Sequence, residues 1–124
     1  MELINLPAKD DTPSVVLDVQ NGKYEIAGKS MPEDVASFYQ PIMAWLDDYA
    51  ENGSGKMVFD FKLVYFNTAS SKLLLDILIK LEEMHEAGKE ISIRWYYPND
   101  DEDMQEAGEE YADMIEVPIE MIGY

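Results

Sequence analysis

Residues 58–71, VFDFKLVYFNTASS, lead from the most apolar segment of this chain into a sequence that can start a helix. The apolar density of residues 57–66 predicts a central strand that is covered on both faces. Asn67 and Thr68 follow with side-chain oxygens that can cap free helical amides, and apolar spacing predicts a helix over residues 69–87. A strand that leads directly into a capped helix is typical of an α/β fold.

The residues before this stretch predict a hairpin and a first helix. Residues 15–19 and 24–27 have the composition of strands, and the Asn21-Gly22 pair between them favours a tight antiparallel turn. The run Ser30-Met31-Pro32-Glu33 has the spacing of a capping box, with proline in the first turn. The first helix is therefore expected to begin there and to end at Asn52-Gly53.

The residues after the stretch predict two more strands and an acidic helix. Residues 91–97 alternate like a strand, and residues 100–112 form an acidic helical segment. Residues 115–119 are expected to form an edge strand, because Pro118 has no N–H to donate to a sheet. In the first helix, Pro41 is expected to cause a distortion, since it removes one backbone donor.

These elements give the order β-β-α-β-α-β-α-β, which describes a single α/β domain over residues 1–124 with helices packed on a mixed β-sheet. The N-terminus has no basic and apolar leader, and no run approaches the ~20 apolar residues of a membrane helix. The chain contains no cysteine, which fits a reducing compartment. We therefore expect a cytoplasmic protein.

The chain is strongly acidic, with 26 Asp and Glu against 9 Lys and Arg and a formal net charge of -17. Such a surface repels nucleic acid and anionic membranes, so neither is an expected partner. Residues 98–124 contain ten acidic residues and no basic one. This segment is expected to be either a solvated helix face or the source of a field that steers a basic partner.

Residues suited to catalysis or metal binding are scarce. The single histidine is His85, near the end of a predicted helix, and with no cysteine a zinc site is not expected. Residues 100–103, DDED, lack the spacing of a calcium-binding loop, so we expect no metal and no cofactor. An enzyme that uses Asp60 with the acidic C-terminal segment is an alternative, although the sequence pairs Asp60 with no base or nucleophile.

The strand-to-helix junction at residues 66–72 is the strongest candidate for a functional site. Capping by Asn67 or Thr68 is a sufficient structural reason for its polar residues. A helix N-terminus also stabilises an anion, so a phosphoryl group on Thr68 would lie at the positive end of the helix dipole. Lys72 follows one turn later. The junction can therefore serve both as a cap and as a phosphorylation site.

The helix after the junction has apolar residues on two sides. One stripe is expected to face the sheet and consists of Leu74, Ile77, Leu78 and Leu81. Leu75 and Ile79 lie away from that stripe. They predict either a regulated docking surface beside the junction or a contact with another segment of the chain.

The run over residues 58–71 resembles the phosphorylation segment of STAS domains, the anti-sigma factor antagonists. In that family, a strand with an aspartate leads to an Asp-Ser-Ser-Gly-like turn at a helix start, and the serine is phosphorylated. Here Asn67 replaces the aspartate, Thr68 stands at the phosphorylated position, and Ala69-Ser70 replaces Ser-Gly.

Nearly the whole chain resembles the SiaC family of bacterial regulatory phosphoproteins, which have a STAS-like fold. The single motifs are short, but together and in this order they are specific. They are Asp11-Thr12-Pro13, Asn21-Gly22, Gly28-Lys29-Ser30-Met31-Pro32-Glu33, Phe38-Tyr39-Gln40-Pro41, Trp45-Leu46, Phe66-Asn67-Thr68, Ser70-Ser71-Lys72, Trp95-Tyr96-Tyr97, Asp101-Glu102-Asp103 and Glu106-Ala107-Gly108-Glu109.

This resemblance implies a non-enzymatic switch. A partner kinase would phosphorylate Thr68, a PP2C-type phosphatase would remove the phosphate, and the unphosphorylated form would bind and activate a diguanylate cyclase in cyclic di-GMP and biofilm control. The free protein is expected to be monomeric, and an anti-sigma factor antagonist in a partner-switching cascade is the alternative. The expected partner-binding residues surround the switch and are Asn67, Ser70, Ser71, Lys72, Leu75 and Ile79.

Overall fold

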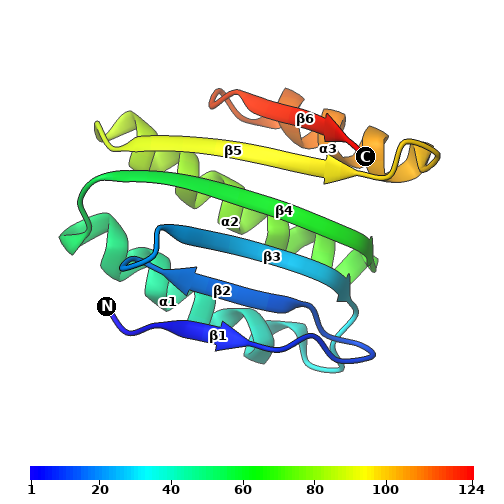
Figure 1. Ribbon diagram of the computed structural model, residues 1–124, viewed down its shortest axis with the longest axis horizontal. Coiled ribbons are helices and arrows are strands. Elements are labelled where there is room, and N and C mark those ends of the chain that lie inside the picture. The colour runs from blue at the N-terminus through cyan, green and yellow to red at the C-terminus, as the bar shows by residue number, and fades with distance from the viewer.

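Six strands form one sheet, and three helices lie against one of its faces (Figure 1). The computed structural model describes residues 1–124. The strands are β1 (Ile4–Leu6), β2 (Ser14–Asp18), β3 (Lys23–Ser30), β4 (Lys56–Phe66), β5 (Glu90–Tyr97) and β6 (Ile119–Gly123). The helices are α1 (Val35–Asn52), α2 (Thr68–Glu86) and α3 (Glu102–Met114). None of these helices has the length and apolar character needed to cross a membrane.

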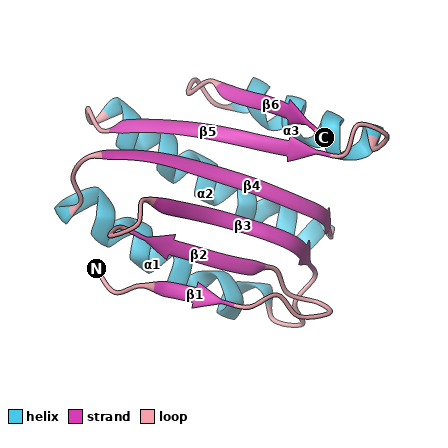
Figure 2. Cartoon of the chain, in the orientation of Figure 1, coloured by secondary structure: helices cyan, strands magenta, loops and turns pink.

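The strands lie in the sheet in their sequence order, from β1 to β6. The first three are antiparallel neighbours, whereas β3, β4, β5 and β6 are parallel and are joined by the three helices (Figure 2). This arrangement confirms the predicted mixed sheet and the predicted order of its elements. The short edge strand β1 is additional, and its three residues show no alternation of buried and exposed positions that could have indicated it.

The core lies between the sheet and the helices, where 25 buried hydrophobic residues form one cluster. The residues of β4 that point into this core are fully buried and are Met57, Phe59, Phe61 and Leu63. The alternate residues Asp60 and Lys62 lie on the opposite face of the sheet, which no helix covers. The prediction that β4 is covered on both faces is therefore wrong, because these alternate positions carry charged side chains that pair across strands.

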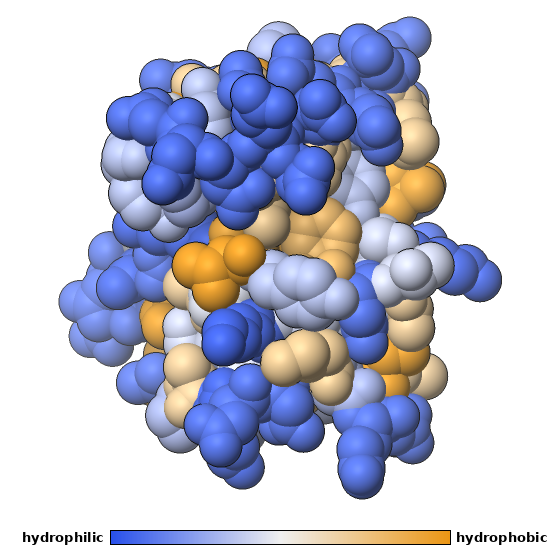
Figure 3. Space-filling model, turned by 90° about the vertical axis from the view of Figure 1, so that its right-hand side faces the viewer, coloured by the Kyte–Doolittle hydropathy of each residue, from blue (hydrophilic) through white to orange (hydrophobic).

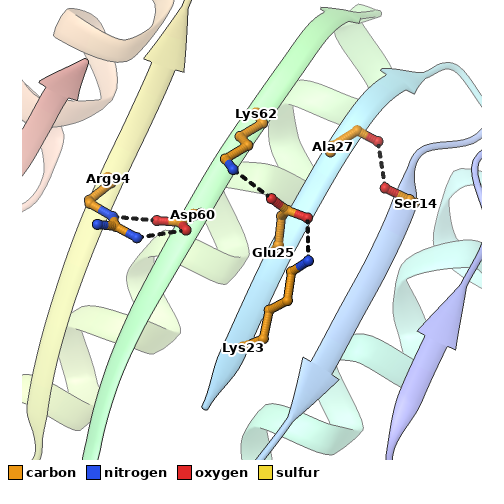
Figure 4. Close-up of polar contacts among 7 residues, drawn as sticks. All are labelled: Ser14, Lys23, Glu25, Ala27, Asp60, Lys62 and Arg94. Carbon is orange, nitrogen blue, oxygen red and sulfur yellow. Dashed lines mark hydrogen bonds and ion pairs between the residues drawn. The ribbon is translucent and has the colours of Figure 1, made fainter. Parts of the chain in front are cut away.

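Ion pairs between and within strands occupy the uncovered face of the sheet (Figure 4). The Arg94 guanidinium on β5 donates two hydrogen bonds to the Asp60 carboxylate on β4, at 2.6 and 2.9 Å. The Glu25 carboxylate on β3 lies between two ammonium groups, 2.9 Å from Lys62 and 3.7 Å from Lys23. These pairs are partly exposed, so each contributes little to the free energy of folding, but together they let the face meet water.

The first helix, α1, begins later than predicted. Its N-cap is Asp34, whose carboxylate accepts a hydrogen bond from the Ser37 amide at 3.1 Å. Ser30, the predicted cap, pairs with Phe66 as the last residue of β3 and is fully buried. The chain must leave the sheet before it can start a helix, which moves the cap four residues along. The exposed Pro41 lies inside α1 and does not end it.

The C-terminal elements also begin later than predicted. The N-cap of α3 is Asp101, and β6 begins at Ile119, directly after Pro118. β6 is an edge strand, as expected. Ile115 and Val117 were predicted to belong to it, but they lie in the connection before it, where they are buried in the core. Burial without sheet pairing explains why their apolar spacing suggested a strand.

Candidate functional site

Hydrogen bonds to the end of β3 hold the β4–α2 junction in place. The backbone N–H of Asn67 donates to the Ser30 carbonyl at 3.1 Å. The side-chain oxygen of Asn67 accepts from the backbone N–H of Ser70 at 2.9 Å. Asn67, one of the two predicted caps, is thus the N-cap of α2, and Thr68 is the first helical residue. Thr68 is exposed, while its carbonyl accepts from the Ser71 hydroxyl at 2.6 Å. An accessible threonine therefore lies at a helix end whose backbone is fixed.

Three buried hydroxyl groups connect α1, β3 and the first turn of α2. Tyr39 Oη and Ser30 Oγ are 2.5 Å apart, and Ser30 Oγ donates to Ser70 Oγ at 2.9 Å. Ser70 Oγ in turn donates to the Ser30 carbonyl at 2.9 Å. Because a serine hydroxyl has one proton, Ser30 cannot donate to both neighbours, so the proton between it and Tyr39 belongs to the tyrosine. All three of these hydroxyl groups have hydrogen-bond partners, and their bonds hold the start of α2 against the core.

A fourth hydroxyl group holds α3 against the same turn of α2. Tyr111 Oη donates to the Ser71 carbonyl at 2.8 Å. Burial raises the pKa of Tyr111 well above its usual value. Burial also raises the pKa of Tyr39, although the hydrogen bond with Ser30 opposes this effect. Both tyrosines therefore remain protonated at neutral pH and act as fixed donors.

The predicted partner-binding residues do not all reach the surface. Lys72 is exposed, and 38 % of Ile79 is accessible. Asn67 and Ser71 are half-buried in the junction. Ser70 is fully buried, with its hydroxyl held by Ser30, so it supports the junction and presents no side-chain surface to a partner.

The two sides of α2 differ, as the apolar spacing indicated. The stripe that faces the core is fully buried and consists of Leu74, Ile77, Leu78 and Leu81. On the other side, Thr68, Lys72 and Ile79 are exposed. Leu75 is half-buried between α2 and α3, where it lines a cavity of about 220 Å³ together with Met114. Leu75 therefore combines both alternatives, a contact with another segment and an apolar surface near Thr68.

The other residues considered for chemistry are dispersed. Asp60 forms the ion pair with Arg94 on the uncovered face of the sheet. His85 is exposed in the last turn of α2. The side chain of Asp101 is used as the cap of α3, where it accepts from the Met104 amide at 3.0 Å. No group of three or more His, Asp or Glu side chains is placed to hold a metal ion.

Ser30, Tyr39 and Tyr111 belong to the junction, although the sequence did not identify them. Ser30 bonds to a tyrosine 9 residues away and to a serine 40 residues away, and Tyr111 bonds to a carbonyl 40 residues away. No local spacing marks contacts of this kind. They follow from the order of strands in the sheet, which brings the end of β3 beside the end of β4.

Comparison with known sequences decides the family. A sequence model described as SiaC family regulatory phosphoprotein matches residues 6–124. The chain belongs to the SiaC family. It is accordingly a regulatory protein and not an enzyme. A relative in the family, an uncharacterised protein of Pseudomonas aeruginosa strain UCBPP-PA14, is 31% identical over 118 residues, which are 95% of this chain and 94% of that protein.

Solved structures of SiaC from Pseudomonas aeruginosa share the fold over the full length. The crystal structure of apo-SiaC has 30% identity and a TM-score of 0.89, with 98% of this chain and 99% of that chain covered. A second SiaC structure has 29% identity and a TM-score of 0.91, with both chains fully covered. The third is the crystal structure of the diguanylate cyclase SiaD in complex with its activator SiaC. It matches with 30% identity and a TM-score of 0.92, covering 98% of this chain and 99% of that one.

Proposed function

We propose that this SiaC family member is an adaptor controlled by phosphorylation, with Thr68 as the switch. A partner kinase phosphorylates Thr68, and a PP2C-type phosphatase removes the phosphate. The unphosphorylated form binds and activates a diguanylate cyclase, which promotes biofilm formation through cyclic di-GMP. Membership of a family of regulatory phosphoproteins supports the adaptor role, and the geometry of the β4–α2 junction supports the position of the switch.

The observation that carries this proposal is the exposed position of Thr68 at the N-terminus of the 19-residue helix α2. A phosphoryl group at this position meets the positive end of the helix dipole, which stabilises a negative charge by roughly 0.3–1 kcal/mol. The first turn of α2 contains no acidic residue that would repel it, and Lys72 follows one turn later. Phosphorylation therefore changes the surface without destabilising the fold.

Thr68 lies on the same side of α2 as the exposed Lys72 and Ile79. Leu75 lies between Lys72 and Ile79 in the sequence. An effector that packs apolar groups against Leu75 and Ile79 would have to remove water from a phosphate on Thr68. Phosphorylation adds about -1.5 to -2 charges at neutral pH. Burying such a group without a cationic partner costs several kcal/mol, so phosphorylation should release the effector while the protein stays folded.

A diguanylate cyclase is the proposed effector because a SiaC relative of 30% identity is described as the activator of the cyclase SiaD. The alternative, an anti-sigma factor antagonist, would act on a sigma-regulatory kinase instead. A pull-down from the source organism with unphosphorylated protein separates the two. Recovery of a cyclase supports the proposal, whereas recovery of an anti-sigma kinase in its place contradicts it.

Variants of the two threonines in the chain, Thr68 and Thr12, test the switch directly. Mass spectrometry of kinase-treated protein should find one phosphate on Thr68, none on a Thr68→Ala variant, and normal modification of a Thr12→Ala control. Thr68→Ala should bind the cyclase with or without kinase treatment. Thr68→Asp should unfold near the parent temperature and bind at least about tenfold more weakly, equivalent to about 1.4 kcal/mol.

Two results would contradict the proposed switch. The first is a phosphate found on another residue of the junction, such as Ser71. The second is equal binding of the cyclase by the phosphorylated and unphosphorylated forms, measured by calorimetry or biolayer interferometry. Thr68→Asp carries only one charge, so the phosphorylated protein itself is the decisive sample.

A further inference from the structure

A groove with an apolar floor runs along α3 on the side that faces β4 and α2. One cavity of about 320 Å³ lies between the end of β4 and the start of α3. A second cavity of about 220 Å³ lies between α2 and α3. Phe66 and Ala107 line both cavities, so the two lie next to each other. We call the two adjacent cavities the α3 groove, and its apolar lining includes Phe66, Leu75, Met104, Ala107 and the exposed Met114.

The backbone of the sheet opens this groove. β4 and β5 are paired only as far as Phe61 and Trp95, after which β5 continues beside β6 (Figure 1). The register with β3 shifts after Gly28, which leaves Val64 without a partner in that strand. Val64 and Tyr65 are consequently 44% and 50% exposed at the mouth of the first cavity. The opening therefore belongs to the fold itself.

The rim of the α3 groove is acidic and has no counter-charge within the chain. Asp101 and Asp103 line the first cavity, and Glu110 lines the second. None of these carboxylates takes part in an ion pair. Residues 98–124 contain no Lys or Arg at all. Figure 3 shows apolar surface on this side of the molecule with hydrophilic residues around it.

We propose that the α3 groove binds an amphipathic helical segment of a partner, with apolar side chains in the two cavities and Lys or Arg side chains against the acidic rim. This inference rests on the proposed adaptor function and specifies the chemistry of the segment that the effector presents. α3 has 13 residues, a length of roughly 20 Å at 1.5 Å per residue, so a partner helix of about four turns can span the groove.

Charge complementarity favours this occupant over the others. A second copy of the chain would bring a net charge of -17 to an acidic rim, so self-association through the groove is opposed. The same repulsion opposes nucleic acid and anionic lipid. A cationic helix is attracted before contact and then anchored by apolar burial. Its association should therefore slow as salt is raised, while its dissociation should change less.

Three peptides of about 14 residues test the groove with defined probes. The first has leucine at helical spacing and lysine elsewhere, the second replaces lysine with glutamate, and the third scrambles the first. The NMR signals of the Met104 and Met114 methyl groups report the two cavities. Only the first peptide should shift both signals. Equal shifts with the scrambled peptide, or shifts confined to methionines outside the groove, would overturn the proposal.

Charge-reversal variants provide the matched control, because they leave the apolar packing intact. Asp103→Lys with Glu110→Lys reverses two of the three rim charges, and Glu51→Lys with Glu86→Lys makes the same change in net charge at exposed helix positions outside the groove. The rim pair should weaken peptide binding at least tenfold, and the control pair should weaken it less than threefold. Equal effects of the two pairs would show that peptide binding depends only on the net charge of the protein. That result would overturn the proposal that the peptide binds in the α3 groove.

The effector assay separates this inference from the proposed switch. If the rim pair weakens cyclase binding while phosphorylation of Thr68 does not, the α3 groove stands and the switch fails. If phosphorylation releases the cyclase but the rim pair binds it normally, the switch stands and the groove is refuted as its docking site. Both experiments use the full chain, so neither result depends on a fragment folding alone.

Discussion

The starts of α1 and α2 use the same capping geometry but differ in the charge of the cap. Asp34 caps α1 by accepting from the Ser37 amide at 3.1 Å, and Asn67 caps α2 by accepting from the Ser70 amide at 2.9 Å. Both caps therefore satisfy the amide three residues on, as capping side chains usually do. The difference is that the α1 cap is a carboxylate, whereas the α2 cap is a neutral amide.

α3 resembles α1 rather than α2. Its cap is Asp101, and Glu102 and Asp103 add two more carboxylates in its first turn. In a chain with a net charge of -17, α2 is thus the one helix whose N-terminus has neither an acidic cap nor an acidic first turn. The positive end of its dipole stays uncompensated. A phosphate on Thr68 would place its negative charge at this positive end and would be stabilised by it.

The two starts also differ in how they are supported. At α1, the Ser37 hydroxyl donates to the Asp34 carboxylate at 2.8 Å on the exposed surface. At α2, the equivalent Ser70 belongs to the buried hydroxyl chain with Ser30 and Tyr39. The α2 start is therefore fixed from inside the molecule, and its outer side is left free for a modifying enzyme and a partner.

The largest expected effect on stability comes from breaking this internal support. Ser30→Ala leaves Tyr39 Oη without its acceptor and Ser70 Oγ without its donor. An unsatisfied buried polar group costs about 1–3 kcal/mol, so we expect Ser30→Ala to lower the free energy of unfolding by roughly 2–3 kcal/mol. Urea denaturation measures this value. Ser37→Ala, at the exposed start of α1, should cost less than about 0.5 kcal/mol.

Equal costs for the two serine variants would show that the buried chain does not support α2 more than the surface bond supports α1. A small cost for Ser30→Ala with unchanged amide exchange in the first turn of α2 would have the same meaning. Protection of the Ser70 and Ser71 amides is the local readout, because both lie in that turn. It should fall in Ser30→Ala and remain unchanged in Ser37→Ala.

The second prediction concerns pH, because only one of the two caps titrates. The hydrogen bonds from the Ser37 amide and hydroxyl lower the pKa of Asp34 below its usual value. A group whose pKa is lower in the folded state stabilises the fold above its unfolded pKa, and this contribution is lost as pH falls through the folded pKa. Asn67 is neutral, so its cap contributes equally across that range.

Two cap variants measured at two pH values test this difference. The advantage of the parent over Asp34→Asn should shrink as pH falls from neutral to below about 3.9, the pKa of a free aspartate. Asn67→Ala should cost about 1 kcal/mol at both pH values. Comparing each variant with the parent at the same pH cancels the contributions of the other carboxylates. A pH-independent difference between parent and Asp34→Asn would contradict this account.

The sequence predicts the elements that depend on local signals. The hairpin at Asn21-Gly22, a helix cap at Asn67 or Thr68 and the buried stripe of α2 follow from turn chemistry or helical spacing. The structure confirms the hairpin and the stripe and selects Asn67 as the cap. The capping box at Ser30 has equally good spacing and fails, because strand pairing with β4 takes that residue first. Local pattern alone therefore cannot choose between a cap and a strand end.

The parts of the site that the sequence did not predict depend on contacts between distant elements. The burial of Ser70 depends on the end of β3 lying beside the first turn of α2. The α3 groove depends on where the pairing of β4 with β5 ends, at Phe61 and Trp95. Neither feature is indicated by the pattern of neighbouring residues in the sequence. The choice of Thr68 as the switch rests on its place at the helix start and on the family resemblance, and it stays a prediction.

The smallest expected effect measures the free dipole of α2 itself. Ala69 and Ala36 occupy the second helical position of α2 and α1, and both are exposed. Ala69→Asp places a carboxylate at the uncompensated N-terminus, so it should raise the free energy of unfolding by about 0.3–1 kcal/mol. Ala36→Asp places one beside Asp34, whose repulsion opposes the gain, so it should change stability by less. Both variants add the same charge to the protein, so the difference in their urea midpoints isolates the local field. High salt should reduce that difference, because the interaction is exposed and screened. If Ala36→Asp stabilises as much as Ala69→Asp, the absence of a carboxylate at the start of α2 gives phosphorylated Thr68 no advantage over the other helix ends.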